Sequence, residues 1–81
     1  MTQIEKLVER LRNHRGLSAF EDVERLLHHH GWMLVRQRGS HVAFGKPGER
    51  PLYLAIVSGR WVKRVYVVDV LKRLGLWRGD G

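Results

Sequence analysis

The chain contains no cysteine and no long apolar run. Without cysteine it has no disulfide framework, no thiolate nucleophile and no cysteine-ligated zinc, so stability must come from packing. Any chemistry must come from histidine, serine, carboxylates or the backbone. No apolar stretch approaches the roughly 20 residues of a membrane helix, and the acidic Glu5 and Glu9 lie where a signal peptide has its apolar segment. We therefore expect a cytoplasmic protein with no membrane partner.

With 81 residues, the chain is also too short to hold a cofactor-binding domain beside a catalytic one. A chain of this size buries only about 60% of its unfolded surface. Its composition, 43% hydrophobic and 28% charged, is that of an ordinary folded domain rather than a disordered tail. One small domain with a compact core is therefore expected.

Acidic residues are scarce in the second half of the chain. The net charge is +7, and between residues 36 and 78 only Glu49 and Asp69 oppose ten lysines and arginines. A field of this sign attracts polyanions, and it fits nucleic acid, an acidic protein or an anionic lipid surface. The lipid surface is disfavoured because the apolar faces are needed to build the core.

Two amphipathic helices are predicted before the first strand, because apolar side chains recur there at helical spacing. The first covers residues 2–14, and Thr2 followed by Glu5 has the spacing of a capping box. The second covers about 19–30, with Ser18 predicted as its cap. Each helix is expected to bury one face.

Three segments of strand character follow, at residues 32–38, 41–46 and 52–57. The pair Gly39 and Ser40 suits a tight hairpin turn between the first two segments. Side chains alternate between the two faces of a strand. If Val42 and Phe44 face the core, His41 therefore faces the other way.

The last element carries apolar residues at helical spacing, namely Val67, Val70, Leu71 and Leu74. Its β-branched beginning, Val65 to Val70, also suits a strand, but the periodicity favours a helix. The predicted order is two helices, a three-stranded antiparallel sheet and a third helix. This is an α+β fold in which helices cover one face of the sheet.

Histidines are the residues most suited to chemistry, and three of them, His28 to His30, are consecutive. Consecutive helical residues point about 100° apart, so these imidazoles cannot converge on one ion, and no metal is expected. Ser40 precedes His41, but a Ser-His-Asp triad lacks its third member. His41 lies instead on the predicted uncovered face among cations, where an imidazole can act on a phosphodiester. An ordinary surface histidine at a hairpin is the alternative.

The segment Leu26–Trp32, the string VRQRGSH at Val35–His41 and the ending Leu71–Leu76 resemble the HicA toxins of bacterial type II toxin–antitoxin systems. The resemblance covers about residues 18–76. It implies a double-stranded-RNA-binding-domain-like fold, ribonuclease action on messenger RNA and neutralisation by a HicB antitoxin. By the family's motif, the histidine after the Gly-Ser pair is catalytic, and here it is His41.

The chain departs from the family pattern in three places. Val42 and Val57 stand where many relatives have further histidines, and the helix over residues 2–14 is additional. This helix is interpreted as a packing element, as a contact in a homo-oligomer or as a cover for the basic face.

We therefore expect a HicA-like domain over residues 18–77, an additional helix and break over 1–17, and a tail at 78–81. His41 is the expected general base on a ribose 2′-hydroxyl, with no metal or cofactor. The residues expected to bind the RNA are Arg36, Arg38, Ser40, Arg60, Lys63 and Arg64. The alternative is a non-catalytic RNA-binding module of the same fold, in which His41 is only a contact.

Overall fold

The computed structural model describes residues 1–79. Its elements are α1 (Gln3–Asn13), β1 (Ser18–Ala19), α2 (Phe20–His29), β2 (Met33–Arg38), β3 (His41–Gly45), β4 (Leu52–Val57), β5 (Trp61–Val62) and α3 (Arg64–Arg73). The predicted α+β class and all three predicted helices are confirmed. Of the predicted tail at 78–81, residues 80 and 81 lie outside the described part. Within residues 1–79, no helix has the length and apolarity to cross a membrane.

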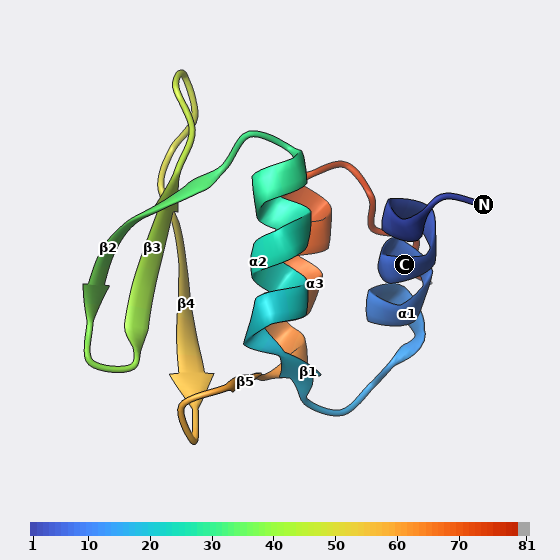
Figure 1. The fold of residues 1–81 in the computed structure, drawn as a ribbon, viewed down its shortest axis with the longest axis horizontal. Coiled ribbons are helices and arrows are strands. Elements are labelled where there is room, and N and C mark those ends of the chain that lie inside the picture. The colour runs from blue at the N-terminus through green and yellow to red at the C-terminus, as the bar shows by residue number, and fades with distance from the viewer. Residues whose placement is uncertain (80–81) are drawn as a thin grey trace.

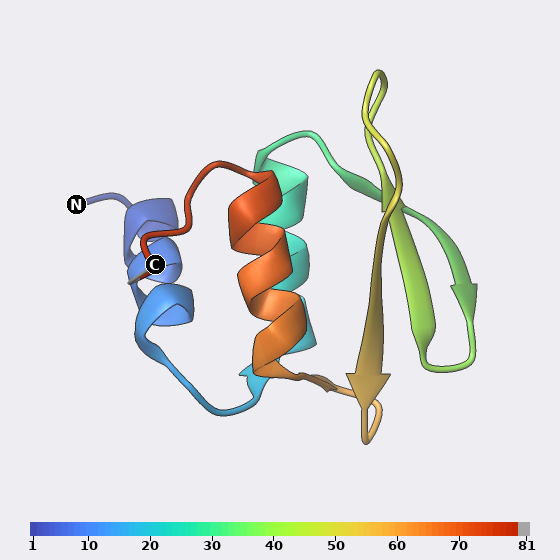
Figure 2. The ribbon, with the colours of Figure 1, turned by 180° about the vertical axis from the view of Figure 1, so that it is seen from behind.

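The elements form three layers (Figure 1). The sheet is the first layer, α2 and α3 lie side by side against one face of it, and α1 lies on the far side of this helix pair (Figure 2). One hydrophobic core joins the layers through buried residues such as Leu7 of α1, Leu27 of α2, Phe44 of β3 and Leu71 of α3. The predicted helical cover of the sheet is therefore provided by α2 and α3, whereas α1 covers the helices.

The sheet has five antiparallel strands in the order β1-β5-β4-β3-β2, not the three predicted. The three predicted strands are present as β2, β3 and β4. The two additional strands contain two residues each and pair with each other. Two residues are too few to show an alternating pattern, so the sequence carried no signal for these strands.

Ser18 does not cap α2, contrary to the prediction. Pairing with Val62 places Ser18 in β1, and Ala19 occupies the cap position without a side-chain hydrogen bond. The Phe20 amide donates instead to the Arg60 carbonyl at 2.8 Å. The first amide of α2 is therefore hydrogen-bonded by a backbone carbonyl next to β5. This contact joins two segments that are far apart in the sequence.

The predicted capping box at the start of α1 is confirmed. The Thr2 amide donates to a Glu5 carboxylate oxygen at 2.8 Å, and the Glu5 amide donates to the Thr2 hydroxyl at 3.1 Å. Hydrogen bonds from the Thr2 backbone and side chain lower the pKa of Glu5. The stabilisation from this carboxylate is present above its unfolded pKa and is lost as the pH falls through its lowered folded pKa.

The apolar face of α1 packs within this chain. Leu7 and Leu11 are each only 2% exposed, and α1 contacts both α2 and α3. An ion pair between Arg10 of α1 and Asp22 of α2, at 3.1 Å, adds a polar contact between the two helices. These contacts support the packing role among the three that the sequence left open for this helix.

Candidate nucleic-acid interface

The face of the sheet opposite α2 and α3, which we call the open face, carries the candidate site. Two rows of paired residues cross it, Arg36, Ala43 and Tyr53 in one row and Arg38, His41 and Ala55 in the next. Directly paired residues of antiparallel strands place their side chains on the same face. The alternate residues of β3, Val42 and Phe44, are buried on the other face. The predicted orientation of β3 is therefore confirmed.

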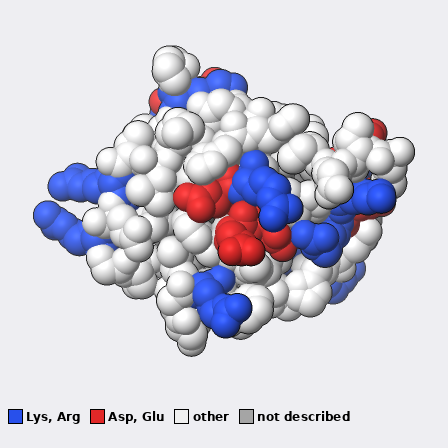
Figure 3. Space-filling model, in the orientation of Figure 1, with Lys and Arg blue, Asp and Glu red and all other residues white. Residues whose placement is uncertain are grey.

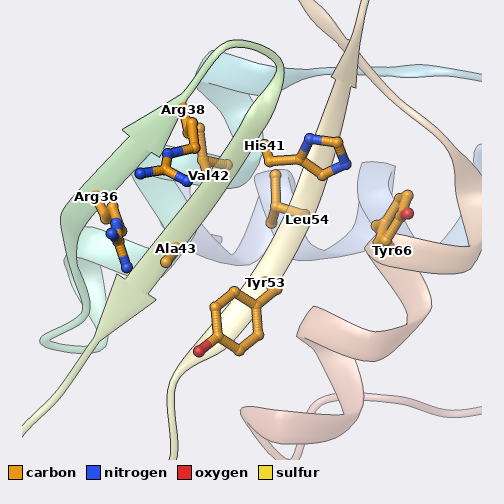
Figure 4. Close-up of a pocket in the computed structure, with 8 residues that line it drawn as sticks. All are labelled: Arg36, Arg38, His41, Val42, Ala43, Tyr53, Leu54 and Tyr66. Atoms are coloured by element: carbon orange, nitrogen blue, oxygen red, sulfur yellow. The ribbon is translucent and has the colours of Figure 1, made fainter.

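A tight turn holds His41 beside Arg38. Gly39 adopts a φ of 61°, in the left-handed region that glycine enters at little cost, and the turn ends at Ser40. The Ser40 carbonyl accepts a hydrogen bond from the Ile56 amide at 2.7 Å, which ties the turn to β4. His41 then begins β3 directly opposite Arg38, where paired Cβ atoms lie about 4.5–5.5 Å apart. His41 and Arg38 are thus backbone neighbours on the open face, with the imidazole over β4 and the guanidinium on the β2 side (Figure 4).

A hollow of about 230 Å³ lies beside His41 (Figure 4). Its lining residues come from three strands and α3, and are Arg36, Arg38, His41, Val42, Ala43, Tyr53, Leu54 and Tyr66. The volume is below the roughly 300–1,000 Å³ of a pocket that encloses a small molecule. It is better suited to one phosphate or one base of an extended polymer.

Two tyrosines of this hollow, Tyr53 and Tyr66, were missed at the level of sequence. The alternation of β4 placed Tyr53 on the face opposite Leu54, but its position near His41 depends on the register between β3 and β4. Tyr66 reaches the hollow from α3. No local pattern in the sequence could have connected that helix to the hairpin.

A known protein family matches the part of the chain that forms the open face. Residues 20–76 match the family model described as the HicA toxin of bacterial toxin–antitoxin systems. The match begins with α2, ends just beyond α3 and contains every residue of the hollow. The chain belongs to the HicA toxin family. Searches of curated proteins and of solved structures gave no match.

Family membership confirms the resemblance that the motifs indicated. The HicA match excludes α1 and β1, which lie before its first residue. The first helix, which the sequence analysis interprets as additional to the HicA pattern, lies before this boundary.

Two further basic residues predicted to bind RNA lie outside the hollow but at the same end of the sheet. In this HicA chain the β2–β3 turn, the β4–β5 turn and the start of α3 all lie at that end (Figures 1 and 2). Arg60, in the β4–β5 turn, stacks over the Trp61 ring at 5.2 Å from its centroid. Lys63 is exposed immediately before α3, where it is the N-cap residue.

Arg64, by contrast, is engaged by α1. Its guanidinium donates to the carbonyls of Leu11 and His14 at 2.6 Å and of Arg12 at 2.5 Å, and it lies over the Trp77 ring. These carbonyls lie at the C-terminal end of α1, where the helix dipole favours a cation and the carbonyls lack partners within the helix. The structure therefore provides Arg64 with partners other than the phosphate expected for it.

The sheet end of this HicA protein is basic on the face drawn in Figure 3. Acidic side chains gather over α2 with basic side chains beside them, whereas the side chains that project from the end of the molecule that carries the sheet are basic (Figure 3). The acidic residues of α2 are Glu21, Asp22 and Glu24. A polyanion is therefore drawn towards the sheet end.

The consecutive histidines at the C-terminal end of α2, His28 to His30, are not among the residues that line the hollow beside His41. The His28 ring lies 3.9 Å from the Glu24 carboxylate, and the rings of His29 and His30 are 5.4 Å apart. Burial, followed by the charges of His29 and Lys46, lowers the pKa of His30. Among residues 1–79, no three histidine, aspartate or glutamate side chains gather as metal ligands.

Proposed function

We propose that this HicA family member is a toxin-type endoribonuclease that cleaves messenger RNA. The observation that carries this proposal is the position of His41 directly opposite Arg38, with Arg36 in the neighbouring row of an uncovered sheet face. Arginine binds phosphate through a rigid fork of donors, and a nearby imidazole can move a proton. Membership of a toxin family supports a harmful activity, and the net charge of +7 supports a polyanionic substrate.

In the proposed mechanism, His41 is the general base. Its free ring nitrogen accepts the proton of a ribose 2′-hydroxyl while the 2′-oxygen forms a bond to the adjacent phosphorus. The bond from phosphorus to the 5′-oxygen of the next nucleotide breaks, and this oxygen takes up a proton from solvent. The guanidinium groups of Arg36 and Arg38 stabilise the negative charge on the phosphate oxygens. The products are a 2′,3′-cyclic phosphate and a 5′-hydroxyl, and the chemistry requires no metal ion.

The fold supports the same proposal. Helix α2, the strands β2 to β4 and α3 follow in the order expected of a double-stranded-RNA-binding-domain-like fold, which we propose for residues 18–77. We propose that Ser40, Arg60 and Lys63 contact the RNA backbone beside His41. Residues 1–17 form the additional element of this proposed division.

The alternative function is a non-catalytic RNA-binding module, with Lys63 and the N-terminus of α3 gripping phosphates. The start of α3 favours this alternative, because no side chain caps its first amides. Incubation of the purified protein with RNA in the presence of a chelator separates the two functions. Strand scission supports the ribonuclease, whereas tight binding without scission supports the module.

We expect RNA affinity to fall steeply as salt rises, because binding releases counterions from phosphates. Each lost phosphate contact should lower the slope of log affinity against log salt by about 0.7 to 0.9. Arg36→Ala, Arg38→Ala and Lys63→Ala should each flatten the slope in fluorescence-anisotropy titrations. The charge-matched changes Lys6→Ala and Arg15→Ala, in and after α1, should leave it unaltered. Equal slopes for both sets would place the RNA elsewhere.

We also propose that a HicB-like antitoxin is acidic and covers His41 and the neighbouring arginines. Charge complementarity favours such a partner, and masking the cations is the direct way to exclude a polyanion. The purified complex should therefore lose RNA binding in a gel-shift assay, while the free toxin retains it. Equal RNA affinity of the complex and the free toxin would rule out inhibition by occlusion.

A further inference from the structure

Tyr53 is the most exposed aromatic residue within residues 1–79. Its side chain is 68% exposed, whereas the other phenylalanines, tyrosines and tryptophans are buried or half-buried. It lies in the middle of a strand of the open face, in the same row as Arg36. An aromatic ring left in water at this position loses the free energy that burial would provide, so a ligand that covers it gains that energy.

The surroundings of Tyr53 leave space towards His41. On the open face its neighbour on β3 is Ala43, and the next residue along β4 is Ala55. Both alanine side chains end at Cβ, so neither fills the space between the Tyr53 ring and the His41 ring. His41 and Tyr53 are diagonal neighbours across β3 and β4, a separation of about 7–8 Å that aromatic side chains can bridge. Figure 4 shows both rings over β4 and both guanidinium groups on the β2 side.

We propose that Tyr53 is a stacking platform for an unpaired base of the RNA next to the scissile phosphate. This inference rests on the proposed function and adds a base subsite to it. Cations hold the backbone of any strand, whereas an exposed ring binds the flat face of a base and tolerates every base type. A base inside a duplex has both faces stacked, so the ring selects a single-stranded segment.

The same arrangement gives Tyr53 a positioning role. A base stacked on its ring limits how far the strand can slide along the open face, and so keeps one phosphate beside His41 and Arg38. RNA is favoured over a protein partner because the arginines and the imidazole line the same hollow as the ring, and the hollow has room for one base.

The test uses the full-length protein and a single-stranded 2′-O-methyl RNA, whose blocked 2′-oxygen prevents the proposed cleavage. Anisotropy titrations are made with this strand and with a blunt duplex of the same sequence. Tyr53→Ala should weaken binding of the single strand about 5- to 150-fold, and Tyr53→Phe should retain it. The salt slope should not change, since no charge is removed. Val65→Ala, which removes a 61% exposed side chain from α3, is the matched control.

The outcomes separate this inference from the proposed function. If wild type bound neither RNA, both would be wrong. If wild type and Tyr53→Ala bound the single strand equally well, the base subsite would be overturned and the proposed ribonuclease would stand. The Tyr53 ring would then be assigned to a contact with a protein partner. An equal loss on the duplex would also overturn it, because stacking on an unpaired base cannot explain that loss. Circular dichroism of each variant verifies that it is folded.

Discussion

His41→Ala should reduce RNA cleavage by about 10²- to 10⁴-fold, which is the typical contribution of a general base. The fold should persist because His41 is exposed at the start of β3, while Val42 and Phe44 hold the buried side of that strand. His41→Ala should therefore lower the free energy of unfolding by far less than the roughly 2–5 kcal/mol of a core truncation. RNA affinity should also persist, since Arg36 and Arg38 keep their charges.

Cleavage rates of purified variants on one RNA, measured in chelator, test this expectation. His29→Ala is the matched control, because it removes another exposed histidine, from α2. The control should cut at the wild-type rate. If His41→Ala, shown folded by circular dichroism, also cut at that rate, the assignment of the general base would have to be abandoned.

Arg64→Ala should lower the free energy of unfolding by about 2–4 kcal/mol. The substitution removes charged hydrogen bonds to three carbonyls at the end of α1 and the stacking over Trp77, and a hydrogen bond to a charged group is worth about 1.5–3 kcal/mol. The loss is large against the roughly 5–15 kcal/mol that stabilises a small domain.

Urea unfolding followed by circular dichroism measures this loss. The adjacent Lys63→Ala should change stability by less than about 0.5 kcal/mol, because Lys63 is exposed. Arg64→Lys should recover only part of the loss, since an ammonium lacks the planar fork that reaches several carbonyls. Equal urea midpoints for Arg64→Ala and Lys63→Ala would show that the hydrogen bonds from Arg64 to α1 contribute nothing to stability.

The parts of the fold with long periodic patterns could be predicted from the sequence. The three helices and the strands β3 and β4 were found because an apolar residue recurs at the spacing of each element. Strand β2 shows no such recurrence, and the Gly39-Ser40 turn marked it as the partner of β3 in a hairpin. The pairing of β1 with β5 was missed, since two residues show no period and the partners are more than 40 residues apart. The prediction that Ser18 caps α2 was wrong for the same reason. The local sequence signals a cap, but pairing with the distant Val62 places Ser18 in a strand.

The candidate site was predictable only as far as local geometry reaches. His41, Arg38 and Arg36 could be placed together because a two-residue turn fixes the register of one hairpin. Tyr53 required the register of the next strand pair. The position of Arg64 required knowledge of where α1 packs, and this is determined by side-chain contacts over more than 50 residues. Charge alone could not distinguish a phosphate-binding arginine from one that caps a helix.

The chemical identity of the cleaved ends is the most direct measurement of the central claim, that the open face activates a ribose 2′-hydroxyl. Wild-type protein is incubated in chelator with RNA, and with the same RNA carrying a single 2′-deoxyribose at the mapped cleavage position. The account predicts a 2′,3′-cyclic phosphate and a 5′-hydroxyl from the first substrate, and no scission at the altered position of the second. A 3′-hydroxyl with a 5′-phosphate, or undiminished scission at the deoxyribose, would contradict it.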